Sequence, residues 1–103
     1  MMQGDSYILP IEILNADGSV VTADSVIDVE ITIGFLRKTY KSATVSFDAS
    51  LGKWLFPITQ EESFQFPASR VKAQVRVRWK SGGVEGASLG TINVAESLSK
   101  EVL

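Results

Sequence analysis

The sequence predicts an all-β fold, an antiparallel immunoglobulin-like β-sandwich of about seven short strands. Several stretches alternate apolar and polar side chains with a period of two, which is typical of strands buried on one face. Glycine, asparagine and aspartate cluster between these stretches, as they do in tight turns. Helix is expected only as one turn near 59–64 and as a short C-terminal helix. A small β-barrel is the alternative architecture.

The N-terminal part of the chain predicts a strand and its return. Residues 7–14 ("YILPIEIL") form the first candidate strand, and Pro10, which has no N–H to donate, indicates an edge or a bulge. The segment "NADGS" at 15–19 has the composition of a tight turn, so residues 20–23 are expected to return as a short strand. The face predicted to be buried consists of Tyr7, Leu9, Ile11 and Ile13.

The next strand is predicted at 25–36, where alternation is cleanest. Asp28 and Glu30 fall on its polar face, and residues 37–42 are expected to be a polar connection. The side chains predicted to point into the core are Ile27, Val29, Ile31 and Ile33.

The middle of the chain predicts a hairpin followed by a helical turn. Residues 43–48 and 53–59 are the two strands, and Pro57 again indicates an edge. Thr59 followed by Glu62 has the form of a capping box, which predicts helix at 59–64, with Pro67 ending it. The adjacent Glu61 and Glu62 are interpreted as helix N-terminal charges rather than as a catalytic pair.

A last hairpin is predicted from 70–79 and 84–94 around the turn "SGG". Gly86 and Gly90 are candidate bulge or close-approach positions in its second strand. Either Trp54 or Trp79 could anchor the core, because aromatic side chains bury large apolar areas. The first strand of this hairpin places Val71, Ala73, Val75, Val77 and Trp79 on one face and Lys72, Gln74, Arg76, Arg78 and Lys80 on the other.

The basic face of 70–79 has three interpretations. It is simply solvated, it binds an anion, or it forms cross-strand ion pairs in which Asp28 and Glu30 face Arg76 and Arg78. The net charge of −2 and the lack of aromatic residues between the basic ones argue against nucleic acid as a partner. The first and third interpretations are preferred.

The composition narrows the classes of function. With 45% hydrophobic and 21% charged residues, the 103-residue chain is expected to fold as one domain, 1–103. It has no cysteine and no histidine, the residues most often used for nucleophilic or acid–base catalysis and for binding metal. No cofactor, metal site, small-molecule substrate or membrane span is predicted, and the protein is not expected to be an enzyme. The start of the chain lacks a signal-peptide pattern, so we expect the protein to work where it is made.

Four segments resemble small proteins encoded among the tail genes of phages and prophages of Gram-positive bacteria. The segments are "GDSYILPIEI", "LGKWLFPITQEESFQFP", "VKAQVRVRWKSGGVEG" and "SLSKEVL", and the second is the most distinctive. The outline is also similar to the N-terminal immunoglobulin-like module of baseplate upper proteins. The resemblance implies a tail or baseplate accessory protein that is present in the host cytoplasm before assembly and in the virion or phage-like particle afterwards.

The expected function is therefore that of a non-catalytic structural module that binds other phage structural proteins or itself. The segment 96–103 is amphipathic and could dock on a neighbour through Leu98, Val102 and Leu103, or pack on its own sandwich or fray. The alternative is a carbohydrate-binding sandwich that recognises cell-wall or host glycans. The aromatic residues available for stacking on sugar rings would be Trp54, Trp79, Tyr7 and Tyr40.

Overall fold

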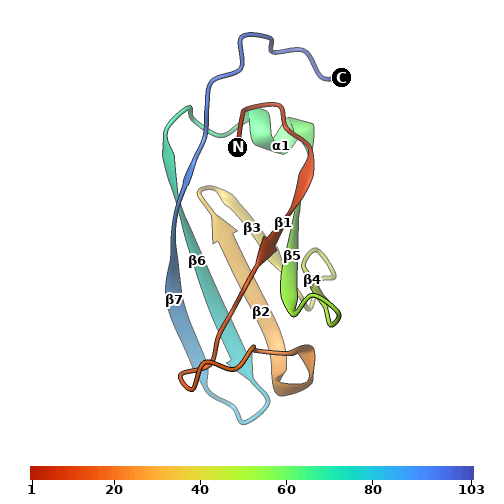
Figure 1. Ribbon diagram of the computed structural model, residues 1–103, viewed down its shortest axis with the longest axis vertical. Helices are drawn as coiled ribbons and strands as arrows, with labels where there is room; N and C mark the ends of the chain where they lie inside the picture. Colours follow the sequence, from red (N-terminus) through yellow and green to blue (C-terminus); the bar gives the residue numbers. More distant parts are fainter.

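The computed structural model describes residues 1–103 as two antiparallel sheets packed face to face (Figure 1). One sheet has three strands in the order β1-β5-β4, and the other has four in the order β3-β2-β6-β7. The expected all-β sandwich is confirmed. The elements are β1 (Tyr7–Ile11), η1 (Ala23–Ser25), β2 (Val26–Ile33), β3 (Leu36–Thr39), β4 (Ser46–Asp48), β5 (Lys53–Ile58), α1 (Gln60–Phe64), β6 (Arg70–Trp79) and β7 (Val84–Asn93).

The strand order is immunoglobulin-like. In chain order, β1 to β7 occupy the positions of strands B, C, C′, D, E, F and G, which gives a B-E-D sheet and a C′-C-F-G sheet. The strand that would precede β1 at the edge of its sheet is missing. The N-terminal residues instead run across one end of the molecule, where Met2 forms a parallel bridge to Ala95 just beyond β7.

The core lies between the two sheets and is centred on Trp54 of β5, whose side chain is fully buried. The Trp54 indole donates a 2.9 Å hydrogen bond from Nε1 to the carbonyl oxygen of Val21. Tyr40 packs edge-on against the indole, with 5.3 Å between the ring centroids. The ring of Phe47 is tilted against the indole, with 4.9 Å between the centroids. These contacts join β5 to its hairpin partner β4 and to the segments around Val21 and Tyr40.

Strand β6 has the expected alternation. Val71, Ala73, Val75 and Val77 are buried, and the residues between them are exposed. Trp79, at the end of the strand, is only half-buried.

The predicted orientation of Ile27 is wrong. The register between β2 and β6 shifts between Val26 and Asp28, so a bulge interrupts the alternation there. Val26 takes the core position, and Ile27 is 44% exposed. From Val29 to Ile33 the predicted inward face is correct.

One predicted strand is absent, and one predicted connection contains a strand. Residues 20–23 form no strand and contribute only an isolated bridge between Val20 and Leu14. Residues 37–39, predicted as the start of a polar connection at 37–42, instead belong to β3. This strand pairs with β2 across the turn at Gly34 and Phe35. A single polar strand at a sheet edge lacks the alternation by which strands are recognised.

The two prolines have different positions in their sheet. Pro10 lies in β1, which is an edge strand as predicted. The prediction for Pro57 is wrong, because β5 is the central strand. However, β4 pairs only with residues 53–55 of β5, so Pro57 lies beyond the end of β4 and has a strand on one side only. A proline is tolerated there because no ladder hydrogen bond is lost on the open side.

The expectation of a C-terminal helix is also wrong, since residues 96–103 form no regular element. Ser97 Oγ donates to the carbonyl oxygen of Ser99, and the N–H of Glu101 donates to Ser99 Oγ. Such local side-chain bonds compete with helix formation, and a segment this short cannot offset the cost of starting a helix.

In β7, the predicted bulge is present at Gly90, where the register with β6 shifts, and absent at Gly86.

Candidate interaction surfaces

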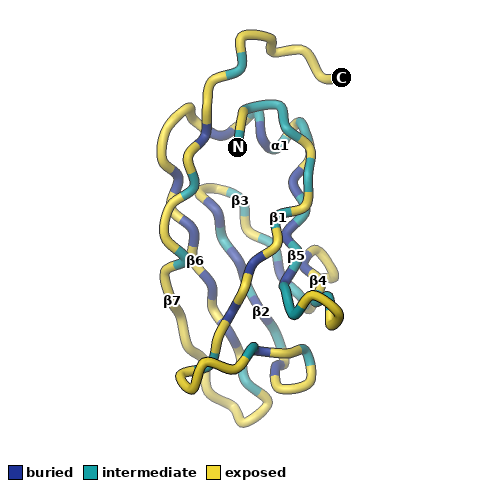
Figure 2. Tube along the Cα trace, in the orientation of Figure 1, coloured by how far each residue is buried: buried dark blue, intermediate teal, exposed yellow.

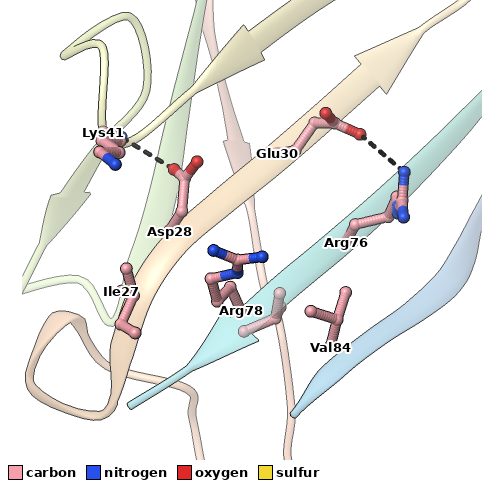
Figure 3. A pocket seen from close by; sticks show the side chains of 8 residues that line it. Ile27, Asp28, Glu30, Lys41, Arg76, Arg78 and Val84 are labelled. Carbon is pink, nitrogen blue, oxygen red and sulfur yellow. Dashed lines mark hydrogen bonds and ion pairs between the residues drawn. The ribbon is translucent and has the colours of Figure 1, made fainter. Parts of the chain in front are cut away.

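The outer face of the four-stranded sheet brings together the predicted cross-strand neighbours. In the β2–β6 register, Asp28 lies opposite Arg78 and Glu30 lies opposite Arg76. Figure 3 shows these four side chains on the solvent side of the two strands. The hollow between them has a volume of about 250 Å³ and is also lined by Ile27 and Val84.

Only one of the two predicted ion pairs forms. Glu30 is 4.0 Å from Arg76, but its closer partner is Arg37 of β3, at 2.6 Å. Asp28 makes no ion pair with Arg78. Its Oδ1 instead accepts the N–H of Lys41 at 2.9 Å, which ties the loop after β3 to β2 (Figure 3).

Basic side chains outnumber acidic ones on this face, although the chain as a whole has a net charge of −2. Arg76 and Arg37 have side chains more than half exposed, so their attraction to Glu30 contributes little stability. The face would favour an acidic partner through long-range attraction. The charged strand residues of this face are Asp28, Glu30, Arg37, Arg70, Lys72, Arg76 and Arg78.

The outer face of the three-stranded sheet carries an apolar patch that the sequence analysis did not identify. Ile8 pairs directly with Pro57, and Pro10 pairs directly with Leu55, so these four side chains form one contiguous outer patch. Ile8 is 58% exposed. The signal was present in the sequence, because "YILPI" and "KWLFPI" are apolar on both of their faces rather than on one.

A charged pair borders this outer patch. Lys53 Nζ and Glu12 Oε2 are 2.7 Å apart, and both side chains are partly exposed. An apolar patch next to charges of both signs is a common composition of protein–protein interfaces, with a hydrophobic centre and a polar rim.

A second apolar surface lies between the free edges of β1 and β7. It is a groove of about 270 Å³, and Glu12 is its only charged residue. Strand β7 is exposed along most of its length, as Figure 2 shows. The groove is lined by Leu9, Pro10, Ile11, Glu12, Ile33, Ala73, Leu89 and Ile92.

The C-terminal residues predicted to dock are all exposed. The exposed fractions of Leu98 and Leu103 are both 103%, and that of Val102 is 52%. The segment leaves the top of the sandwich and extends past the N-terminus (Figure 1). It is held there by Gln3, whose Oε1 accepts the N–H of Ser97 and the ammonium of Lys100.

The aromatic residues considered for glycan stacking are largely used in packing. Trp54 is fully buried, and Tyr40 packs against it. Tyr7 and Trp79 are half-buried. The Nε1 of Trp79 is buried without a hydrogen-bond partner.

The capping box that was predicted at Thr59 and Glu62 is present and has an additional partner. Thr59 Oγ1 accepts the N–H of Glu62, and Glu62 Oε1 accepts the N–H of Thr59. Lys38 Nζ donates to the same Oε1 at 2.9 Å and to the carbonyl oxygen of Pro57 at 2.6 Å. The Lys38 ammonium also lies 5.5 Å from the centre of the Phe56 ring. Lys38 therefore joins β3, β5 and α1.

The pKa of Glu62 is lowered from 4.5. Burial alone would raise it, but the hydrogen bonds from Thr59 and Lys38 and the charge of Lys38 outweigh burial. A carboxyl whose pKa is lowered by folding stabilises the fold above its unfolded pKa, and this contribution is lost as pH falls through the lowered value.

We predict that Glu62→Gln destabilises the protein near neutral pH and much less in acid. The substitution removes the charge that holds Lys38, and charged hydrogen bonds contribute about 1.5–3 kcal/mol each. Urea unfolding of the wild type and the variant at about pH 7 and about pH 3 would measure this. Equal destabilisation at both pH values would contradict it, and Glu61→Gln, on the exposed side of the same turn, is the control.

No cluster of three or more acidic, histidine or cysteine side chains is placed to hold a metal ion. None of the helices has both the length and the apolar character needed to cross a membrane. No protein-family model, curated protein or solved structure matches this chain.

Proposed function

We propose that this chain is a non-catalytic structural module that joins other proteins of a phage or prophage tail or baseplate. The observation that carries the proposal is the outer patch of Ile8, Pro10, Leu55 and Pro57. These directly paired apolar side chains lie on the outer face of the sheet, where Ile8 and Pro10 are exposed and Leu55 and Pro57 are half-buried. The four segments that resemble tail-gene proteins support the same assignment, and two of them contain the patch residues.

The outer patch suits attachment by face packing. A partner that covers Ile8 and Leu55 removes apolar surface from water, at about 25 cal/mol per Å². The neighbouring Lys53 and Glu12 offer one charge of each sign for orienting the partner. Pro10 lies on the edge strand β1 and hinders uncontrolled strand pairing without blocking contact through the face.

The proposal places the protein in the host cytoplasm before assembly and in the assembled particle afterwards. Particles induced from the bacterium that carries the gene should contain this chain after purification, as measured by mass spectrometry. A photo-crosslinking residue at position 8 should capture another particle protein. The same residue at position 51 should not, although Leu51 is a similarly exposed apolar residue in the turn between β4 and β5.

We also predict that Ile8→Asp prevents incorporation into particles, whereas Leu51→Asp does not. A charge at position 8 would have to be buried without a partner in the interface, which costs several kcal/mol. Both side chains are exposed in the isolated protein, so neither variant should unfold it. Purified particles that lack the wild-type chain, or that contain the Ile8→Asp variant at wild-type levels, would refute the proposal.

A further inference from the structure

The sandwich is open along the side between β1 and β7. Each is the edge strand of its own sheet, and the immunoglobulin-like strand that would extend the β1 edge is missing. An unpaired strand edge presents free N–H and C=O groups that can pair with another chain. On this side of the molecule the apolar β1–β7 groove lies beside two such edges.

The β1–β7 groove leaves core side chains incompletely covered. Leu9 of β1 and Leu89 and Ile92 of β7 line it but are only half-buried, whereas Ile33 and Ala73 at its floor are buried. The groove therefore lacks one layer of apolar contacts that an added extended segment would supply. Edge strand β7 carries no proline and a single charged residue, Glu85, and its one irregularity is the bulge at Gly90.

The chain itself contains a segment whose pattern fits the groove. In an extended conformation, residues two apart lie on the same side, so Glu96, Leu98, Lys100 and Val102 would share one face of residues 96–103. Leu98 has no packing partner, since it is fully exposed. The hydrogen bond from the Ser97 N–H to Gln3 holds the segment beyond the end of its own sandwich, and Lys100 would exchange Gln3 for its partner in a neighbouring molecule.

The segment carries Glu96 and Glu101 as well as Lys100, so charge can fix its register through Lys100 but does not select it. Glu12 is the only charged residue of the groove. Its Oε2 is paired with Lys53, but its Oε1 makes no hydrogen bond. Lys100 follows Leu98 by about 6.6 Å along an extended chain, and its long stem can carry the ammonium to Glu12 while Leu98 enters the apolar part.

We propose that residues 96–103 of one copy lie extended in the β1–β7 groove of a second copy. Leu98 and Val102 pack on Leu89 and Ile92, and Lys100 pairs with Glu12. The mode is strand addition to a sheet edge, in which backbone bonds give affinity and alternate side chains give specificity. Donor and acceptor surfaces differ, so the contact is head-to-tail and can continue from copy to copy into a ring or a filament. This inference rests on the proposed function and names a second copy as one partner.

The test uses sedimentation of purified full-length chains. The wild type should associate increasingly with concentration. A donor variant, Leu98→Asp with Val102→Asp, and an acceptor variant, Leu89→Asp, should each weaken association by about tenfold or more. An equimolar mixture of the two variants should recover association, because one retains an intact groove and the other an intact segment.

A charge-reversal pair covers the case in which Leu89→Asp fails to fold. Glu12→Lys and Lys100→Glu change exposed groups, each should weaken association, and combining them in one chain should restore it. The inference is overturned if the wild type remains monomeric, if the donor variant associates like the wild type, or if neither mixing nor charge reversal restores association.

The two proposals fail in different ways. If the donor variant associates normally and enters particles while Ile8→Asp does not enter them, the groove inference is wrong and the proposed function stands. If donor and acceptor variants complement each other but no particle contains the chain, the groove inference stands and the proposed function is wrong.

Discussion

Trp54→Ala should destabilise the sandwich by about 3–5 kcal/mol, as large aromatic truncations in a core do. The indole is fully buried, so its loss leaves a cavity between the sheets. Tyr40 and Phe47 lose the ring against which they pack, and the carbonyl oxygen of Val21 loses its donor. Since small domains have about 5–15 kcal/mol of total stability, much of the margin would disappear. Urea unfolding followed by circular dichroism measures the change.

Replacing each tryptophan by phenylalanine compares a hydrogen-bonded, fully buried indole with an unpaired, half-buried one. Trp54→Phe keeps an aromatic ring but removes the Nε1 donor, which leaves the Val21 carbonyl unsatisfied. Trp79→Phe removes an Nε1 group that is buried without a partner. We therefore expect Trp79→Phe to be clearly less destabilising than Trp54→Phe. The opposite order would show that the Trp54 hydrogen bond is not the important contact.

Gly34→Ala should cost about 2–5 kcal/mol, the combined effect of backbone strain and overpacking. Gly34 is in the turn between β2 and β3 and has a φ of 57°, in the region that disfavours side chains. A Cβ added there would lie 2.7 Å from Val71 Cγ1 and 3.2 Å from Phe66 Cε1. Both neighbours are buried and have little room to move. Thermal unfolding would show the loss as a lower Tm.

Gly18→Ala is the control for backbone strain alone. Gly18 also has a positive φ, of 88°, but nothing lies within 4 Å of the position that a Cβ would take. We expect a cost of about 1–2 kcal/mol there, from conformation only. If the two glycine variants were equally stable, the close approach of Val71 and Phe66 would have no energetic importance.

Much of the local structure could be predicted from local patterns. The alternation in 70–79 identified β6 and its buried valines, because side chains of a strand alternate between faces whatever the strand pairs with. Thr59 and Glu62 identified α1, because a capping box is made within one turn. We predicted from charge that Asp28 and Glu30 could lie across from Arg76 and Arg78 on a neighbouring strand, and the β2–β6 register shows this pairing.

The candidate surfaces could be predicted only in part. The exposure of Leu98 agrees with the prediction that the C-terminal segment is available for docking, but docking itself stays a prediction. The outer patch was missed because β1 and β5 carry apolar residues on both faces. The sequence therefore does not indicate which of the two faces is buried. The β1–β7 groove was invisible because it depends on a strand that is missing from one sheet.

From the sequence alone, most of the strands, the start of α1 and the inward-facing side chains of β6 could be placed. These are properties of a few neighbouring residues and of backbone geometry. Only the tertiary structure decided that Ile27 turns outward at a bulge, that β5 with Pro57 is central, and that apolar surface stays open on β1 and β7. The physical reason is that bulges, strand order and coverage depend on contacts between segments far apart in the chain, and hydrophobic burial does not specify which segment supplies the cover.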